Sequence, residues 1–249
     1  MNLTDHHKLL VSQGLMHLFA IIGLFYLWDL TYLWFTLLGI VFFAKLGIEG
    51  YCHRYLSHGA FTLELFLNAF AIFGLQGPPM VWAANHSTYH KYSDVDGDPH
   101  PAENGWRTWF WIGTEKNSVI SSRLIKKLIK DKSHIIVKKY YYVIYWSVVM
   151  LFILVNIKLA LYLFALPAVY SLHAASWVNV FGHRFGYKNF ETNDNSRNIH
   201  LPFILMHPYH NNHHANPSNL TIAVKWYEID HIKFLINLLK KLECLGKLK

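Results

Sequence analysis

The sequence predicts an all-α integral membrane protein whose four membrane-spanning helices form two hairpins. Two observations predict this fold class. Hydrophobic residues make up 53% of the 249-residue chain and charged residues only 15%, whereas soluble domains contain about 25% charged residues. Four apolar runs, separated by polar segments, also approach the roughly 17–25 residues that a spanning helix requires. Composition and runs together indicate a multi-pass membrane protein.

The length suits one unit, so residues 1–249 are expected to form a single domain. The formal net charge is +8. No nucleic-acid recognition motif is present and the basic residues flank apolar runs, so this charge indicates a cytoplasmic membrane face and no nucleic-acid partner. The two cysteines, Cys52 and Cys244, provide neither a disulfide framework nor a metal-binding spacing. Any metal must therefore be held by imidazole or oxygen.

The two hairpins comprise residues 9–27 with 32–48, and residues 140–155 with 159–177. Four spans place both termini and all histidine-rich segments on one side of the membrane. The turns on the other side contain one basic residue, Lys158. Because cytoplasmic loops are enriched in Lys and Arg, the histidine-rich side is predicted to be cytoplasmic.

The segments outside the hairpins are expected to lie at the membrane surface. Residues 61–79 are apolar but interrupted by Glu64 and a Gly-Pro-Pro break, so they should lie against the bundle without crossing the membrane. Two basic amphipathic segments, residues 123–139 and 225–249, are expected to form helices on anionic lipid. Three tryptophans are expected interface anchors: Trp106, Trp109 and Trp111.

Four groups of potential metal ligands lie beside the apolar runs: His53 and His58; His86 and His90; Asn179 and His183; and His210, His213 and His214. Residues three or four apart share a helix face, so the last group places three imidazoles within reach of one centre. The five-residue interval between His53 and His58 needs a helix end or a turn for convergence. One such pair alone is more often structural. Four groups near a bilayer predict a joint metal site, because polar residues there are costly without a partner or a function.

The number of imidazoles favours two octahedral metal ions. A catalytic zinc takes about three protein ligands plus water, so seven or eight histidines are too many for one zinc. The carboxylate type of di-iron site needs a Glu-x-x-His motif on each of two helices. Only Glu228 to His231 matches this motif. Spacing alone therefore predicts a dinuclear site with nitrogen ligands, for which iron, zinc, copper and nickel are all suitable.

These segments resemble the histidine boxes of the membrane fatty-acid desaturases, in particular the stearoyl-CoA (delta-9) type and its bacterial relatives. The matching segments are residues 53–58 (HRYLSH), 82–86 (WAANH) through 98–100 (DPH), 178–187 (VNVFGHRFGY), and 210–214 (HNNHH) with 225–228 (KWYE). They follow the order of the family over nearly the whole chain. The resemblance implies a mushroom-like bundle of four membrane helices under a helical cytosolic cap that holds two iron ions.

By position, the resemblance implies these iron ligands: His53, His58, His86, His90, His183, His210, His213 and His214, with Asn179 binding through a water. One position departs from the family. Its second box usually reads His-x-x-His-His, whereas this chain has Tyr89 where a ninth histidine is expected. Three alternatives remain open: one iron lacks a ligand, the Tyr89 oxygen binds it, or another histidine replaces the missing one. His207, where relatives commonly carry a glutamate, is the candidate for that replacement.

Other residues are expected to surround the site. The segment from Asp94 to Asp98 lacks the closing glutamate of a calcium loop, so its carboxylates are expected to orient imidazole N–H groups. Trp82 and Trp177 are expected to line an acyl tunnel, with ordinary aromatic packing as the alternative. Asn85 and Arg54 are expected to meet a polar headgroup.

The function implied by the resemblance is oxygen-dependent desaturation of a saturated acyl chain. The implied partners are membrane lipid, an acyl group carried by CoA, acyl-carrier protein or lipid, and an electron donor such as cytochrome b5 or ferredoxin. The same site suits a fatty-acid hydroxylase, which is the second hypothesis. A membrane metal transporter is the third, but transporter sites lie near the bilayer midplane, whereas these histidines lie outside the predicted spans.

Overall fold

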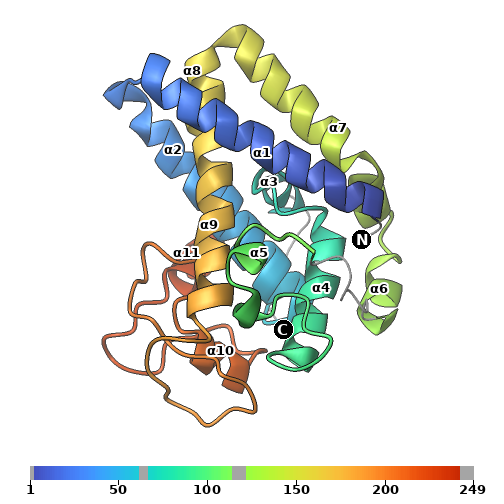
Figure 1. Cartoon of the computed structure of the whole chain (residues 1–249), viewed down its shortest axis with the longest axis vertical. Coiled ribbons are helices and arrows are strands. Elements are labelled where there is room, and N and C mark those ends of the chain that lie inside the picture. Colours follow the sequence, from blue (N-terminus) through green and yellow to red (C-terminus); the bar gives the residue numbers. More distant parts are fainter. Residues whose placement is uncertain (1–2, 62–66, 114–121, 242–249) are drawn as a thin grey trace.

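The computed structural model of the chain describes residues 3–61, 67–113 and 122–241 (Figure 1). Every named element within these ranges is a helix, and the strand-like pairings are two isolated bridges, from Asn198 to Tyr187 and to Tyr209. Four helical stretches are long and apolar enough to cross a membrane: Asp5–Tyr26, Leu30–Ser57, Lys132–Val155 and Ile157–Phe181. The all-helical class and the four candidate spans are thereby confirmed. The predicted features at Glu64, Cys244 and residues 242–249 lie outside the described ranges.

The second candidate span contains a change of helix type. After α1 (Leu3–Tyr26), the 3-10 turn η1 (Leu30–Tyr32) begins at Asp29, whose side chain accepts a hydrogen bond from the Thr31 amide at 3.1 Å. The short α2 (Leu33–Gly39) then continues directly into η2 (Ile40–Ser57), a π-helix. The helix therefore extends to Ser57, beyond the end predicted at residue 48.

The third candidate span begins earlier than predicted. The basic segment of residues 123–139 is divided between α6 (Ser122–Leu128) and the first turns of α7 (Lys132–Val155). Asp131 separates the two helices because its side chain accepts a hydrogen bond from the Ser133 amide at 2.8 Å and caps α7. The prediction of one continuous surface helix was wrong. Its lysines at positions 132–139 belong to a helix that continues into the apolar run.

The last candidate span consists of three contiguous helical pieces: α8 (Ile157–Ala160), the π-helix η5 (Leu161–Ala165) and α9 (Leu166–Phe181). Its start meets the turn between α1 and α2. Lys158 forms an ion pair with Asp29 at 2.6 Å, and the Asn156 side chain donates to the Tyr32 hydroxyl at 2.9 Å. These contacts join the ends of the two helix pairs near the top of Figure 1.

Shorter helices pack against the long ones. Of these, α5 (Trp106–Trp109) and α10 (His210–Ala215) lie near the opposite end of α9 in Figure 1, whereas α3 (Leu67–Phe73) packs against η2. The others are α4 (Pro79–Tyr92), η3 (Ala102–Asn104) and α11 (His231–Lys241). The predicted C-terminal amphipathic helix exists as α11, with Ile232 and Ile236 buried. Of the expected tryptophan anchors, Trp106 is exposed, but Trp111 is buried against Leu9 and Leu172 and is not an interface residue.

The packing of α3 against η2 depends on one glycine. A Cβ atom added at Gly47 would lie 2.6 Å from the backbone nitrogen of Ala71. No side chain can be accommodated there unless the two helices separate. The apolar segment that was predicted to lie against the bundle thus does so, with Leu67 and Ala71 fully buried.

We expect Gly47→Ala to destabilise the protein by about 1–3 kcal/mol, because an overpacked backbone contact forces the helices apart. The thermal midpoint of the detergent-solubilised protein measures this. Gly14→Ala in α1 is the matched control, since a Cβ there has no neighbour within 4 Å. Equal midpoints for the two variants would contradict the proposed role of Gly47.

Candidate metal centre

The π-helical form of η2 brings His53 and His58 together. A π-helix places residues five apart on the same face, because each amide bonds to the carbonyl five residues earlier. The rings of His53 and His58 accordingly lie 5.0 Å apart, with His58 as the C-terminal cap of η2. The helix ends at Ser57, between the two histidines, as one of the two sequence-based alternatives required, and the π-helical pitch before that end brings the rings together.

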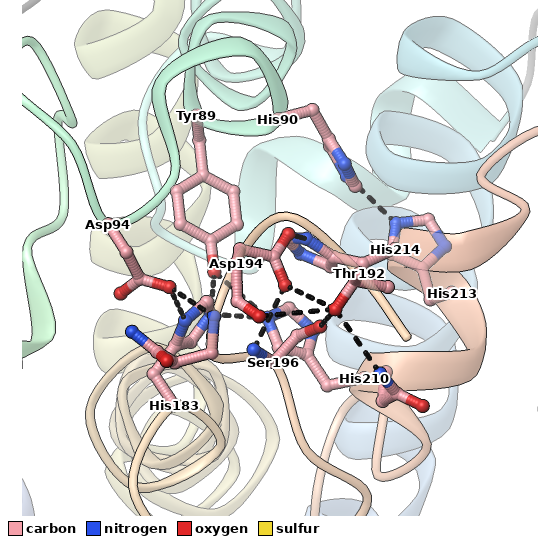
Figure 2. A network of polar contacts seen from close by, with 12 residues as sticks. Tyr89, His90, Asp94, His183, Thr192, Asp194, Ser196, His210, His213 and His214 are labelled. Atoms are coloured by element: carbon pink, nitrogen blue, oxygen red, sulfur yellow. Dashed lines mark hydrogen bonds and ion pairs between the residues drawn. The ribbon is translucent and has the colours of Figure 1, made fainter. Parts of the chain in front are cut away.

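The helix α4 supplies the second pair of histidines. It begins at Pro79, whose fixed φ angle favours the first position of a helix. His86 and His90 share one face, as predicted, and their Nε2 atoms are 3.0 Å apart. Tyr89, next to His90, points to the other side of the site, as Figure 2 shows.

The remaining histidines come from the end of α9 and from α10. His183 lies two residues after Phe181, the last residue of α9, and Asn179 lies on that helix four residues before His183. In α10, His213 turns toward the pairs from η2 and α4, whereas His210 and His214 turn toward His183. The three imidazoles of α10 thus serve two centres and not the single centre that their spacing alone predicted.

Two groups result, and each can hold a metal ion. We call them the five-histidine group (His53, His58, His86, His90 and His213) and the three-histidine group (His183, His210 and His214). Within each group, one nitrogen per residue lies within 4.8 Å of all the others. All eight rings are buried or half-buried.

The spacing of the nitrogens fits metal ligation. In the five-histidine group, successive Nε2 atoms are 2.9–3.0 Å apart in the order His53, His213, His90, His86, His58. Metal–imidazole bonds of about 2.1 Å at right angles place neighbouring nitrogens about 3.0 Å apart. In the three-histidine group, His183 and His210 show the same 2.9 Å separation. The five-histidine group and the His183–His210 pair therefore have the donor spacing of an octahedral ion.

Carboxylates outside the groups lie beside three of the imidazoles, and for His183 and His214 a hydrogen bond from Nδ1 fixes the tautomer. The Nδ1 atom of His53 lies 3.1 Å from Glu49, that of His183 lies 2.8 Å from Asp94, and that of His214 lies 2.5 Å from Asp194. A proton held on Nδ1 leaves the Nε2 lone pair directed at the centre, as in other histidine-metal sites.

The protonation of the ligands also favours metal binding. Burial, with a further contribution from neighbouring imidazoles, lowers the pKa values of four histidines well below their ordinary value: His86, His90, His210 and His213. These rings are therefore neutral and have a free lone pair. His214 Nε2 is buried without a hydrogen-bond partner among the described residues, which suits a nitrogen that binds a cation.

The role predicted for Asp94 is confirmed, but sequence reasoning missed the two other carboxylates. Glu49 lies four residues before His53 on η2, a spacing that could have been recognised. Asp194 lies in a loop and has no such periodic signal. Burial acts to raise the pKa of Asp194, but hydrogen bonds from His214 and Ser196 hold it below its ordinary value, so the carboxylate is charged (Figure 2).

A buried polar cluster lies behind the five-histidine group. Glu49 accepts a hydrogen bond from His207 Nδ1 at 3.0 Å, and its other carboxylate oxygen lies 3.1 Å from His53 Nδ1. Arg54 is only 2% exposed and binds both carboxylate oxygens of Asp230, at 2.9 and 3.0 Å. Its guanidinium is occupied inside the protein. The expectation that Arg54 meets a polar headgroup was therefore wrong.

A cavity opens beside the five-histidine group. Its lining includes His86 of that group, the half-buried Asn179 and the buried His207, together with apolar side chains such as Val81 and Ala175. Trp82 also lines it and stacks on His86, with ring centroids 4.9 Å apart. Trp177 lies elsewhere, against Trp109 and Phe181. Its tunnel role stays a prediction.

Comparison with known proteins gives consistent results. The sequence model of a family described as fatty acid desaturase matches residues 27–235. The chain is 31% identical over 234 residues to the Delta-9 desaturase-like 5 protein of Arabidopsis thaliana, covering 85% of this chain and 76% of the relative. It is also 31% identical over 246 residues to the sn-1 stearoyl-lipid 9-desaturase of Synechocystis sp., covering 90% of this chain and 74% of that relative.

We expect Asp194→Asn to weaken metal binding in the three-histidine group by about 10–100-fold, because His214 loses the carboxylate that orients it. Metal retained against increasing chelator, measured per chain, reports this change. Asp96→Asn is the control, since Asp96 lies exposed in the loop before Asp98. If both variants retain metal equally, Asp194 has no orienting role.

Proposed function

We propose that the two histidine groups hold two iron ions and that O2 is the co-substrate, because the chain belongs to the fatty acid desaturase family. The protein is an oxidoreductase that introduces a double bond into a fatty acyl chain. The division of eight histidines into two groups with ligand-like nitrogen spacing supports the proposal of two ions. Imidazole suits iron among other transition metals.

The proposed ligands are the members of the five-histidine and three-histidine groups, with Asn179 binding through a water. When bound, iron supplies the oxidising chemistry that no side chain can provide. The protein orients the imidazoles through Glu49, Asp94 and Asp194 and keeps the site largely out of solvent. These residues hold the rings in fixed positions while the acyl chain is presented to the centre.

The cavity beside His86 is the proposed binding place of the acyl chain. The apolar part of its lining, which includes Leu9, Val81 and Ala175, suits methylenes, and polar side chains such as Gln76 and Asn85 line the rest. The stacking of Trp82 on His86 places an aromatic wall next to the five-histidine group. Relatives are named for different acyl carriers: an Acyl-CoA 5-desaturase in Anemone leveillei and an sn-2 palmitoyl-lipid 9-desaturase in Nostoc sp.. We propose a saturated acyl group on CoA, acyl-carrier protein or lipid as the substrate.

The proposed membrane arrangement treats residues 1–249 as one unit with two helical hairpins and a cytosolic cap. Both termini and the histidine groups then face the cytoplasm, and the joined turns at Asp29 and Lys158 face the other side. The many Lys and Arg residues on the cap side support this orientation. The same basic face is the proposed docking surface for an electron donor such as cytochrome b5 or ferredoxin.

Expression in a desaturase-deficient host, followed by analysis of total fatty acids, tests the function. We expect new double bonds with the wild-type chain and none with His90→Ala, because His90 belongs to the five-histidine group. Hydroxy fatty acids in place of double bonds would identify a hydroxylase. Unchanged lipids with altered metal uptake would instead support a metal transporter.

The cavity assignment has its own test. Ala175→Leu is expected to lower the rate of desaturation by about 10-fold or more, because a displaced acyl chain no longer meets the centre correctly. Metal content should stay unchanged, since Ala175 lines the cavity and is not a ligand. Val143→Leu, on an exposed face of α7, is the control. Wild-type rates with Ala175→Leu would exclude this cavity as the acyl site.

A further inference from the structure

The three-histidine group contains a fourth potential donor, the hydroxyl oxygen of Tyr89. This oxygen lies 2.9 Å from His210 Nε2 and in shorter contact with His183 Nε2. The Tyr89 ring is 5.4 Å from the His214 ring. Tyr89 is 2% exposed, and Figure 2 shows it reaching from α4 to the space between His183 and His210. The oxygen thus occupies the position of a ligand to the ion that these histidines surround.

His207, the other candidate for the missing ligand, is placed differently. Its nitrogen atoms group with Glu49 and His53 and not with the three-histidine group, and the carboxylate that its Nδ1 contacts at 3.0 Å is Glu49. Its ring lies beside the cavity, 5.1 Å from the His210 ring. His207 is therefore a hydrogen-bond partner of the Glu49 carboxylate and is not part of the three-histidine group.

We propose that Tyr89 binds the metal ion of the three-histidine group through its phenolate oxygen, which makes the two ions chemically unequal. One ion has five neutral nitrogen ligands, whereas the other has three nitrogens and one anionic oxygen. This inference rests on the proposed function, because it takes iron as the resident metal. It explains how the three-histidine group obtains a fourth ligand although α4 carries Tyr89 where the family has a histidine.

In this step the Tyr89 oxygen exchanges its proton for the metal ion. The iron–oxygen bond forms as the Tyr89 O–H bond breaks, and the proton is released to solvent, as is usual when a protonated side chain becomes a ligand. No electron is transferred. An anionic oxygen is a hard donor and stabilises ferric over ferrous iron more than imidazole does. Phenolate bound to ferric iron also produces a charge-transfer band in the visible range, which imidazole ligands do not produce.

The test uses the full chain purified in detergent, loaded with iron and oxidised in air. Iron per chain, the visible spectrum and resonance Raman scattering excited within the band are measured. We expect two irons and tyrosine ring vibrations for the wild type. Tyr89→Phe should lose one iron and the band, whereas Tyr89→His should keep both irons and lose only the band. Tyr92→Phe, on the same helix, should resemble the wild type, because Tyr92 is outside both groups.

Two results would overturn the inference: a ferric wild type with two irons and no band, or a band that persists in Tyr89→Phe. Loss of one iron from His207→Ala, with both retained in Tyr89→Phe, would assign the missing ligand to His207. The spectra are independent of the lipid analysis. If the wild type makes double bonds but shows no charge-transfer band, the Tyr89 ligand is refuted and the proposed desaturation is not. If the wild type shows the band but makes no double bonds, the proposed desaturation is refuted and the Tyr89 ligand is not.

Discussion

The arrangement of the site depends on one constraint: neutral imidazole nitrogens lie close together in a buried space that excludes most water. Eight histidines from four separate segments direct nitrogen atoms at two small volumes. Their lone pairs repel one another, and they cannot all be paired by hydrogen bonds within the groups. Burying polar groups without partners is costly, so a cation in each group would stabilise the arrangement. Binding of these cations would then be linked to the folding of this part of the protein.

The π-helical geometry of η2 brings two of these histidines, His53 and His58, close together. An α-helical pitch would place His53 and His58 on different faces, whereas the wider π-helical turn aligns them. The same pitch aligns Glu49 with Arg54, five residues later, and their side chains meet at 3.3 Å. One face of η2 thus carries ligands, and the polar cluster behind it holds them in place. The close fit at Gly47 anchors this unusual helix against α3.

Sequence periodicity predicted the features that depend on one helix at a time. The apolar runs gave the four candidate spans, and intervals of three and four residues gave the pairing of His86 with His90 and the helix of α10. The rest depends on tertiary structure. Nothing local separates His213 from His210 and His214, which lie in one short helix but serve different groups. Arg54 was misjudged because its partner Asp230 is distant in sequence, and Asp194 lies in a loop without periodicity.

The surroundings of the two groups differ in charge independently of Tyr89. One carboxylate, Glu49, contacts the five-histidine group through His53, and it is shared with His207 and Arg54. The three-histidine group has two carboxylates, Asp94 on His183 and Asp194 on His214. Negative charge behind an imidazole increases the electron density at its ligating nitrogen. An ion held by the three-histidine group would therefore lie in the more electron-rich environment, and an anionic ligand there would add to the difference in charge that the carboxylates already establish.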